Sequence, residues 1–328
     1  MSGALRTGVL GVGSLGYHHA RLLREVAGAE MAGVFDDNPE RLATVSAELG
    51  VRAFRSRDEL LESVDAAVIA VPTSVHADVA LAALDAGVHL LIEKPIATTL
   101  EEADAIVGAA TAKKLVVATG HVERFNAAVR ACEPYLDEPR FVESHRLAPF
   151  NPRGTDVAVV LDLMIHDIDL VLGLVGRHVE SLDAIGVGVL TPSADIANAR
   201  LIFSGGAVAN ITASRVSMER TRKIRFFQQS GYLSLDLAAG TGEFLRLKKG
   251  AALPDGEVGV AALLGLVDRI PLRGDGREPL RAELEAWVAA VRGEGPLVVS
   301  GEDGREALAV ALRIMERIDE HAPSAQPA

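Results

Sequence analysis

Residues 6–16 read Arg6-Thr7-Gly8-Val9-Leu10-Gly11-Val12-Gly13-Ser14-Leu15-Gly16, an apolar run that leads into glycines spaced G-x-G-x-x-G. A helical pattern begins at Ser14 and extends to Val26. Glycine permits a tight turn between strand and helix, and it lets a pyrophosphate approach the N-terminus of that helix. The same spacing also occurs in α/β turns that bind nothing, so the residues around the motif decide its meaning.

The first 120 residues alternate short apolar runs with helical patterns. The sequence predicts strands over residues 6–10, 30–35, 66–70, 89–92 and 115–119, and helices over 14–26, 39–49, 76–86 and 99–113. Continuous apolar strands that alternate with helices indicate a parallel sheet covered on both faces. We therefore expect residues 1–120 to form a Rossmann-type α/β domain.

The pattern changes after Gly120, where longer strand patterns replace the regular alternation. Strands are predicted over residues 140–147, 179–190, 197–203, 207–216, 223–228, 231–237 and 243–248, and helices over 126–136, 156–174, 278–292 and 302–320. Residues 249–277 are rich in glycine, proline and charge, and are predicted to form a loop. We expect residues 121–328 to form an α+β domain, with a mostly antiparallel sheet and helices on one side.

The totals narrow the class of protein. The chain has 328 residues and a net charge of −12, which argues against binding nucleic acid by phosphate neutralisation. Cys132 is the only cysteine, so the chain can form no internal disulfide and no multi-cysteine metal site. No uninterrupted apolar run reaches membrane-spanning length, and the first residues lack a signal-peptide pattern. These features predict a cytoplasmic protein that binds neither nucleic acid nor membrane.

An acidic residue follows the second predicted strand, at the position where Rossmann domains usually bind the adenosine ribose of a dinucleotide. Asp36 lies 20 residues after Gly16. A carboxylate there accepts hydrogen bonds from the adenosine ribose and repels a 2′-phosphate, so NAD is favoured over NADP. The segment from Val71 to His76 follows another strand and is expected beside the dinucleotide, with Thr73 or Ser74 capping the next helix.

Two further segments carry candidate chemistry. Glu93-Lys94-Pro95 follows the strand at 89–92, where a lysine would face the nicotinamide end of the crevice, although an isolated Glu-Lys-Pro is also typical of a solvated loop. Asp162, His166 and Asp169 are spaced i, i+4 and i+7 in a helical segment that is otherwise almost entirely apolar. An acid one turn from a histidine suits proton transfer near neutral pH, whereas the alternative is a structural histidine beside capping or salt-bridging acids.

With these residues placed, the chain resembles the Gfo/Idh/MocA family of nicotinamide-dependent sugar oxidoreductases. The resemblance rests on Gly11–Gly16, Asp36, Ala70-Val71-Pro72-Thr73, Glu93-Lys94-Pro95, Gly120-His121-Val122-Glu123-Arg124-Phe125-Asn126 and Asp162-x-x-x-His166. It implies a Rossmann domain and a C-terminal domain with an open, largely antiparallel sheet. That sheet is expected to form a homodimer or homotetramer.

The resemblance also assigns roles to residues. It implies that Lys94, His166 and Asp162 are catalytic. The residues expected to bind NAD are Gly11, Gly13, Ser14, Leu15, Gly16, Asp36, Val71, Pro72, Thr73, His76, Glu93 and Lys94. The residues expected to bind substrate are Lys94, Arg124, Phe125, Asn126, Asp162 and His166. No metal is expected, although His121 and Glu123 with Asp162 and His166 are a weak alternative metal site.

Within the family, the segments at 120–126 and 162–169 resemble the branch that oxidises the 3-hydroxyl of UDP-N-acetylglucosamine, except that Ala127 stands where proline is expected. The diphosphate would then be bound by cations among Arg146, Arg153, Arg215, Arg222 and Lys223. Dehydrogenation of a free polyol such as an inositol, or of an aldose, is the alternative, and a non-catalytic NAD-binding sensor is a third hypothesis.

The expected chemistry is removal of hydride from a secondary alcohol of a sugar. His166, held by Asp162, is expected to take the hydroxyl proton, and Lys94 to stabilise the developing alkoxide. The lysine and the histidine can exchange these roles, because a desolvated lysine beside another cation titrates far below its usual value. Asp169 is expected to be structural.

Overall fold

The computed structural model describes residues 3–151, 157–251 and 265–321. The chain divides into two compact units, one formed by residues 1–125 with 277–309 and the other by residues 126–276 with 310–328. The sequence predicted a single division near residue 120. The structure differs because helix α9 (Pro279–Arg292) packs into the core of the first unit, where the Trp287 indole donates to the Leu90 carbonyl over 3.1 Å.

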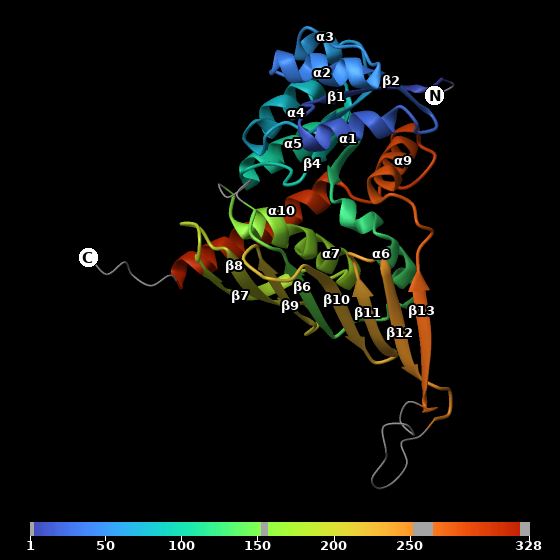
Figure 1. The fold of residues 1–328 in the computed structure, drawn as a ribbon, viewed down its shortest axis with the longest axis vertical. Helices are drawn as coiled ribbons and strands as arrows, with labels where there is room; N and C mark the ends of the chain where they lie inside the picture. The colour runs from blue at the N-terminus through green and yellow to red at the C-terminus, as the bar shows by residue number, and fades with distance from the viewer. Residues whose placement is uncertain (1–2, 152–156, 252–264, 322–328) are drawn as a thin grey trace, which may run out of the picture. The chain divides into compact units, whose positions relative to one another are not determined.

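The first unit is built on a parallel sheet with strand order β2-β1-β3-β4-β5. Figure 1 labels β1, β2 and β4 of this sheet. Its strands are β1 Leu5–Leu10, β2 Ala29–Phe35, β3 Ala66–Ile69, β4 His89–Glu93 and β5 Val117–Gly120. Every residue of β3 is buried, as expected for a strand covered on both faces. The predicted α/β architecture is therefore confirmed, and the order of strands reverses between β1 and β3, where such folds bind ligands.

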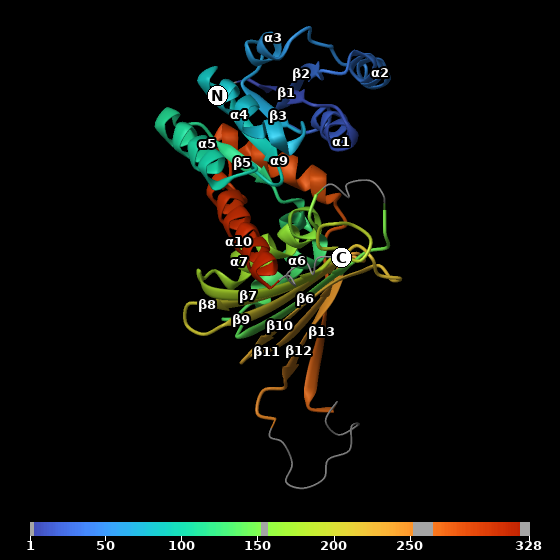
Figure 2. The same ribbon diagram turned by 90° about the vertical axis from the view of Figure 1, so that its left-hand side faces the viewer.

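Helices cover both faces of this sheet. They are α1 Ser14–Leu23, α2 Pro39–Leu49, α3 Arg57–Leu61, α4 His76–Asp85, α5 Leu100–Lys113 and α9. Helix α1 packs against α9, and α4 packs against α5 on the other face (Figure 2). Helix α3 was not predicted, because one and a half turns are too short for a periodic apolar pattern. Its N-terminus is fixed by Ser56, whose hydroxyl accepts from the Glu59 amide.

The second unit is an open eight-stranded sheet with the order β13-β12-β11-β10-β6-β9-β8-β7. Its strands are β6 Phe141–Leu147, β7 Val179–Val187, β8 Ile196–Phe203, β9 Val208–Ser214, β10 Thr221–Gln228, β11 Gly231–Asp236, β12 Thr241–Leu247 and β13 Val267–Arg273. Among the described strands of this sheet, β6 and β9 are the pair that runs parallel. The predicted mostly antiparallel sheet is confirmed.

One face of this sheet carries helices and the other is open in the described part of the chain. Along β8, Ala197, Ala199 and Leu201 are buried while the residues between them are exposed. The buried face lies under α6 (Ala127–Cys132), α7 (Ile165–Val175) and the C-terminal part of α10 (Gly301–Glu320), as Figure 2 shows. This alternation is that of an antiparallel sheet packed on one side.

Strand β13 contradicts the loop predicted over residues 249–277. Residues 267–273 pair antiparallel with β12 at the edge of the sheet. An edge strand tolerates Pro271 and many charged side chains, so its composition resembles that of a loop. Residues 252–264 of the predicted loop lie outside the described residues.

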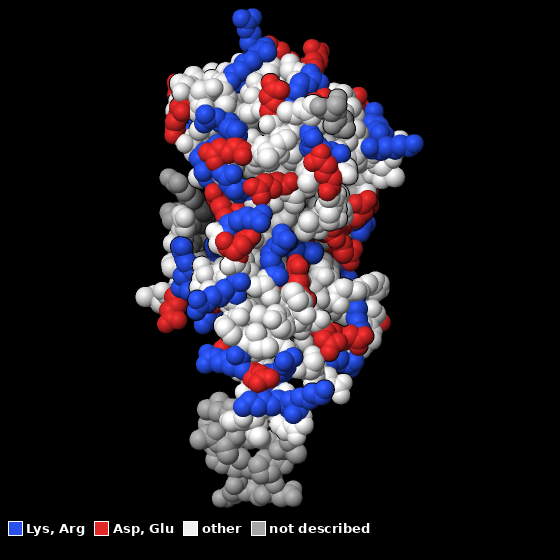
Figure 3. All heavy atoms as spheres, turned by 90° about the vertical axis from the view of Figure 1, so that its right-hand side faces the viewer, with Lys and Arg blue, Asp and Glu red and all other residues white. Residues whose placement is uncertain are grey.

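The surface drawn in Figure 3 carries charges of both signs. Lysines and arginines are interspersed with aspartates and glutamates over most of that face, which therefore lacks the continuous basic field that follows a phosphate backbone. Among the described residues, no helix is long and apolar enough to cross a membrane.

Candidate active site

In the glycine loop between β1 and α1, two glycines are required by the packing of the fold and one leaves space for a ligand. Gly11 has a φ of +83°, and a Cβ there would lie 2.7 Å from the backbone of Ala70. A Cβ on Gly16 would lie 1.8 Å from the Gly11 carbonyl oxygen. A Cβ on Gly13 would meet no protein atom within 4 Å. The fold therefore requires the first and third glycines, while the space at Gly13 is open to a bound phosphate.

Asp36 and Arg41 hold this loop from two sides. The Asp36 carboxylate accepts from the Val12 amide over 2.7 Å and from the Asn38 amide over 2.9 Å. Arg41 donates to the Val12 carbonyl over 2.7 Å and to the Gly13 carbonyl over 3.2 Å. Each carboxylate oxygen accepts more than one hydrogen bond, so Asp36 retains capacity for ribose hydroxyls. The sequence did not reveal Arg41, because nothing in the first turn of α2 marks it as a loop contact.

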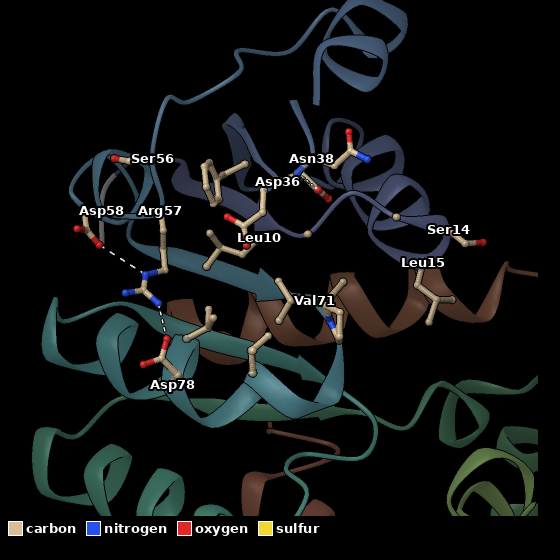
Figure 4. A pocket seen from close by; sticks show the side chains of 18 residues that line it. Leu10, Ser14, Leu15, Asp36, Asn38, Ser56, Arg57, Asp58, Val71 and Asp78 are labelled. Atoms are coloured by element: carbon tan, nitrogen blue, oxygen red, sulfur yellow. Dashed lines mark hydrogen bonds and ion pairs between the residues drawn. The ribbon is translucent and has the colours of Figure 1, made fainter. Parts of the chain in front are cut away.

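A cavity of about 860 Å³ opens beside the glycine loop (Figure 4). The predicted cofactor residues that line it are Gly11, Gly13, Ser14, Leu15, Asp36, Val71 and Pro72. Ala70 and Val75, which belong to segments quoted for the cofactor site, line it too. The lining residues that the sequence did not single out are Leu10, Phe35, Asp37, Asn38, Ser56, Arg57, Asp58, Asp78 and Val79. The cavity lies at the carboxyl ends of β1, β2 and β3, where a dinucleotide binds in this architecture. The described residues thus fit NAD.

Other residues predicted to bind the cofactor are not among those lining this cavity. Gly16 is buried under the loop, and Thr73 begins the short helix η1 (Thr73–Val75). The expected cap by Thr73 or Ser74 is absent, because η1 leads directly into α4, at whose N-terminus no side-chain cap forms.

His76 makes contacts with the backbone that the sequence did not indicate. Its ring is buried, with Nδ1 3.0 Å from the Pro95 carbonyl and Nε2 3.0 Å from the Val71 carbonyl. Burial lowers the pKa of His76. Because a neutral imidazole has one N–H, it donates to one carbonyl at a time. His76 therefore fastens the Val71 loop near Pro95 and presents no ring nitrogen to the cofactor cavity.

Lys94 follows β4 directly. Glu93, the last residue of that strand, is held by a contact with His19. His19 on α1 places Nε2 2.7 Å from Oε1 of Glu93, and the Lys94 amide donates to Oε2 over 3.2 Å. Burial acts to raise the pKa of Glu93, but the His19 hydrogen bond and the nearby Lys94 charge lower it overall. An ionised carboxylate therefore anchors the backbone of Lys94, whose own side chain is half-buried. The sequence did not single out His19.

The acid–histidine segment of the second unit is not one regular α-helix. The prediction placed a helix over residues 156–174. Residue 156 lies outside the described residues, Val160–Met164 form a turn of π-helix, and α7 begins at Ile165. Asp162 lies in the π turn and His166 in the first turn of α7, and both are half-buried. Such wide turns occur often at functional sites.

Burial along this segment differs from the stripe that the sequence predicted. Asp169 is fully buried, as a structural role requires, but Asp167 is buried too and was not singled out. Asp167 accepts from the Ser144 hydroxyl over 2.7 Å and from the Arg146 guanidinium, both on β6. Asp167 thus pins the start of α7 to the sheet, beside the half-buried His166.

Arg146 and Arg215 are not the exposed phosphate donors that the sequence suggested. Arg146 is 3 % exposed and bound to Asp167. Arg215 is 5 % exposed, pairs with buried Asp195 and donates to the Val157 carbonyl over 2.7 Å. Both therefore hold the fold around α7. Arg222 and Lys223 on β10 are exposed, and Arg153 lies outside the described residues.

The segment at 121–126 ends in side chains that serve the fold. Phe125 is 5 % exposed and Asn126 is 6 % exposed. Asn126 accepts from the Ala128 amide as the N-cap of α6 and donates to the Leu237 carbonyl over 2.9 Å. The contact of Phe125 and Asn126 with substrate stays a prediction, and Arg124 beside them is half-exposed. No group of three or more metal-ligating side chains occurs among the described residues.

Comparison with known proteins gives a consistent picture. Residues 5–121 match the model of an oxidoreductase family with an NAD-binding Rossmann fold, and residues 110–234 match the Gfo/Idh/MocA C-terminal domain. UDP-N-acetylglucosamine 3-dehydrogenase of Acidithiobacillus ferrooxidans is 42% identical over 316 residues, 96% of this chain and 97% of the relative. A solved structure of that enzyme covers 97% of this chain and 98% of its own, with a TM-score of 0.88. Myo-inositol 2-dehydrogenase of Thermotoga maritima is 25% identical, over 96% of this chain and 97% of its own.

Proposed function

The chain belongs to the Gfo/Idh/MocA family of oxidoreductases, which bind NAD through a Rossmann domain, and we propose that it oxidises the 3-hydroxyl of UDP-N-acetylglucosamine to a ketone. The observation that carries this proposal is the 42% identity to a UDP-N-acetylglucosamine 3-dehydrogenase over 96% of the chain. The inositol dehydrogenases are more distant, at 25% identity for the Thermotoga maritima enzyme.

The first unit supplies the cofactor site and a lysine. When bound there, NAD would supply the acceptor for the hydride that leaves the sugar carbon. Gly13 leaves room for the pyrophosphate, Asp36 receives the ribose hydroxyls, and Lys94 donates to the reacting sugar oxygen as negative charge develops there. Glu93 fixes the backbone of Lys94, which restricts where the lysine side chain can place its ammonium group.

The second unit supplies the proton acceptor. His166 takes the hydroxyl proton, and Asp162 orients and stabilises the resulting imidazolium. The half-buried position of both side chains suits this role, because a fully buried histidine has no access to substrate. The contacts of Asp167 with Ser144 and Arg146 keep the first turn of α7 in place.

The diphosphate of the substrate needs cations, and Arg146 and Arg215, which the sequence suggested for it, are buried. We assign Arg222 on β10 and half-exposed Arg124 to it, through charge-assisted hydrogen bonds. Arg222 shares the helix-covered face of the sheet with Arg146, whereas Lys223 lies on the opposite face. Because the chain is acidic overall, these local charges must overcome a repulsive long-range field. Binding of the substrate should therefore weaken as salt is added.

We also propose that the chain forms a homo-oligomer through the open face of its sheet. Phe141, Phe227 and Tyr232 from three adjacent strands stack there, with ring centroids 5.5 and 4.9 Å apart. A partly exposed aromatic row suits a buried contact better than a solvated surface. The expected cytoplasmic location stays a prediction.

Calorimetry of the NAD-loaded protein tests the substrate class. UDP-N-acetylglucosamine should bind, UDP alone should bind and compete with it, and both should lose affinity with added salt. Myo-inositol in the same cell is the uncharged comparison. Absence of heat from both nucleotides, together with turnover of the polyol, would assign the chain to the polyol dehydrogenases instead.

A further inference from the structure

The cofactor cavity contains an arginine, which is not expected in a site that Asp36 makes selective for NAD. The charged residues lining it are four carboxylates, Asp36, Asp37, Asp58 and Asp78, and one guanidinium, Arg57. An acid at the position of Asp36 favours NAD, whereas an arginine near the adenosine ribose is the usual means of binding the 2′-phosphate of NADP. Within this cavity, the aspartate therefore favours NAD and the arginine favours NADP.

Arg57 lies at the adenosine end of the cavity. The glycine loop with Ser14 faces the pyrophosphate, and Asp36 faces the ribose. In Figure 4, Asp36 lies between Ser14 and Arg57, so the guanidinium flanks the part of the cavity beyond the ribose. Arg57 is the first residue of α3, which follows α2 and precedes β3.

Two acids hold this guanidinium. Nη1 of Arg57 lies 2.7 Å from Oδ2 of Asp78 on α4, and Nε lies 3.5 Å from Oδ1 of Asp58 (Figure 4). The Arg57 side chain is 34% exposed, and those of Asp58 and Asp78 are 78% and 75% exposed. Pairs this exposed add little to stability, so their contacts with Arg57 have their main effect on charge and on side-chain position.

We propose that Asp58 and Asp78 are specificity-determining residues. They hold the Arg57 guanidinium in ion pairs, so that it does not bind the 2′-phosphate of NADP. Asp36 repels that phosphate directly, and the two acids remove the compensating attraction. The selectivity for NAD thus depends on residues from three separate segments of the first unit. This inference concerns the cofactor and does not depend on the identity of the sugar.

The test measures binding of NAD and NADP to the full-length protein by calorimetry, without sugar. Asp58→Asn combined with Asp78→Asn should raise NADP affinity by about three- to tenfold relative to NAD affinity, a size set by exposed charge pairs. The gain should shrink with added salt. Asp85→Asn is the matched control, because Asp85 also lies on α4, is equally exposed and pairs with Lys113 outside the cavity.

The role of Arg57 is separated by repeating the double substitution in an Arg57→Ala background. Loss of the NADP gain in that background supports the proposal, because the acids then act through the guanidinium. Persistence of the gain would show direct repulsion by the acids and would overturn it. Unchanged NADP affinity in the Asp58→Asn, Asp78→Asn protein, or an equal rise for NAD and NADP, would overturn it as well. Each variant is first compared with wild type by circular dichroism and NAD binding.

Discussion

Nε2 of His19 lies 2.7 Å from Oε1 of Glu93, which joins the helix behind the glycine loop to the residue that precedes Lys94. Both side chains are buried, and the Lys94 amide donates to the other oxygen of the same carboxylate. The pyrophosphate-binding helix and the proposed catalytic lysine are therefore parts of one hydrogen-bonded assembly. A substitution at His19 or Glu93 should therefore change the position of Lys94.

Replacing Glu93 by Gln should lower kcat by about 10- to 100-fold, the range expected when a reacting group is displaced by a fraction of an ångström to one ångström. The amide keeps the size of the side chain but loses the ionised acceptor that fixes Lys94. NAD affinity, measured by calorimetry, should change much less than kcat. Equal kcat values for wild type and Glu93→Gln would show that the His19–Glu93 contact only supports the fold.

Removing either proposed catalytic group should stop most of the reaction. Lys94→Ala and His166→Ala should each lower kcat by at least about 100-fold, the low end for a positioned acid or base. NAD binding should survive His166→Ala, because His166 belongs to the second unit. Steady-state rates and calorimetry on the same preparations measure both. A Lys94→Ala enzyme as fast as wild type would disprove the catalytic role of that lysine.

Asp36 is expected to have two functions, and Asp36→Ala should impair both. The enzyme should prefer NAD, and Asp36→Ala should narrow that preference, because the repulsion of a 2′-phosphate is lost. The same change should weaken NAD binding by roughly 10- to 100-fold, since the Val12 and Asn38 amides lose a charged acceptor. The values of kcat/KM for NAD and NADP provide the measurement. Equal efficiency of the wild-type enzyme with both cofactors would refute the role of Asp36.

Buried Asp195 should make stability depend on acid. Although burial acts to raise its pKa, the Leu190 and Thr191 amides, the Thr191 hydroxyl and the Val189 amide lower the pKa of Asp195 to about 2. The stabilisation is complete above the unfolded-state pKa near 4 and is lost as the pH falls through about 2. It amounts to about 2 kcal/mol.

Urea unfolding followed by circular dichroism, at several values of pH, measures this contribution. Asp195→Asn should reduce stability at neutral pH and flatten its acid dependence between roughly pH 4 and pH 2. The reduction should exceed the pKa contribution, because Arg215 is left buried with a neutral partner. An unchanged acid slope in the variant would mean that another carboxylate is responsible.

The sequence predicted most of the fold because its signals are local. Strands β1 to β5 are continuous apolar runs between turn residues, and most of their observed ends differ from the predicted ends by one or two residues. Strand β13 was missed because an edge strand with a proline has the composition of a loop. The π turn at Val160–Met164 was missed because apolar spacing does not distinguish one wide turn within a helix.

The cofactor site was predictable where its residues are close in sequence, and not where the fold brings them together. The glycine loop and Asp36 belong to one recognisable strand–helix–strand segment. His19 and Glu93 are 74 residues apart and Arg57 and Asp78 are 21 apart, and only the crossovers of the parallel sheet bring each pair into contact. The sequence position of His76 beside the cavity does not reveal that its ring lies against two backbone carbonyls.

The most direct measurement is a product analysis with UDP-N-acetylglucosamine and NAD as the only reactants. The proposed function predicts that NADH forms in equal amount to the substrate consumed and that nuclear magnetic resonance of the product shows a ketone at carbon 3 with the UDP group intact. His166→Ala protein should yield neither signal above background. Absence of NADH with this substrate, with steady NADH formation from myo-inositol under the same conditions, would contradict the proposed function.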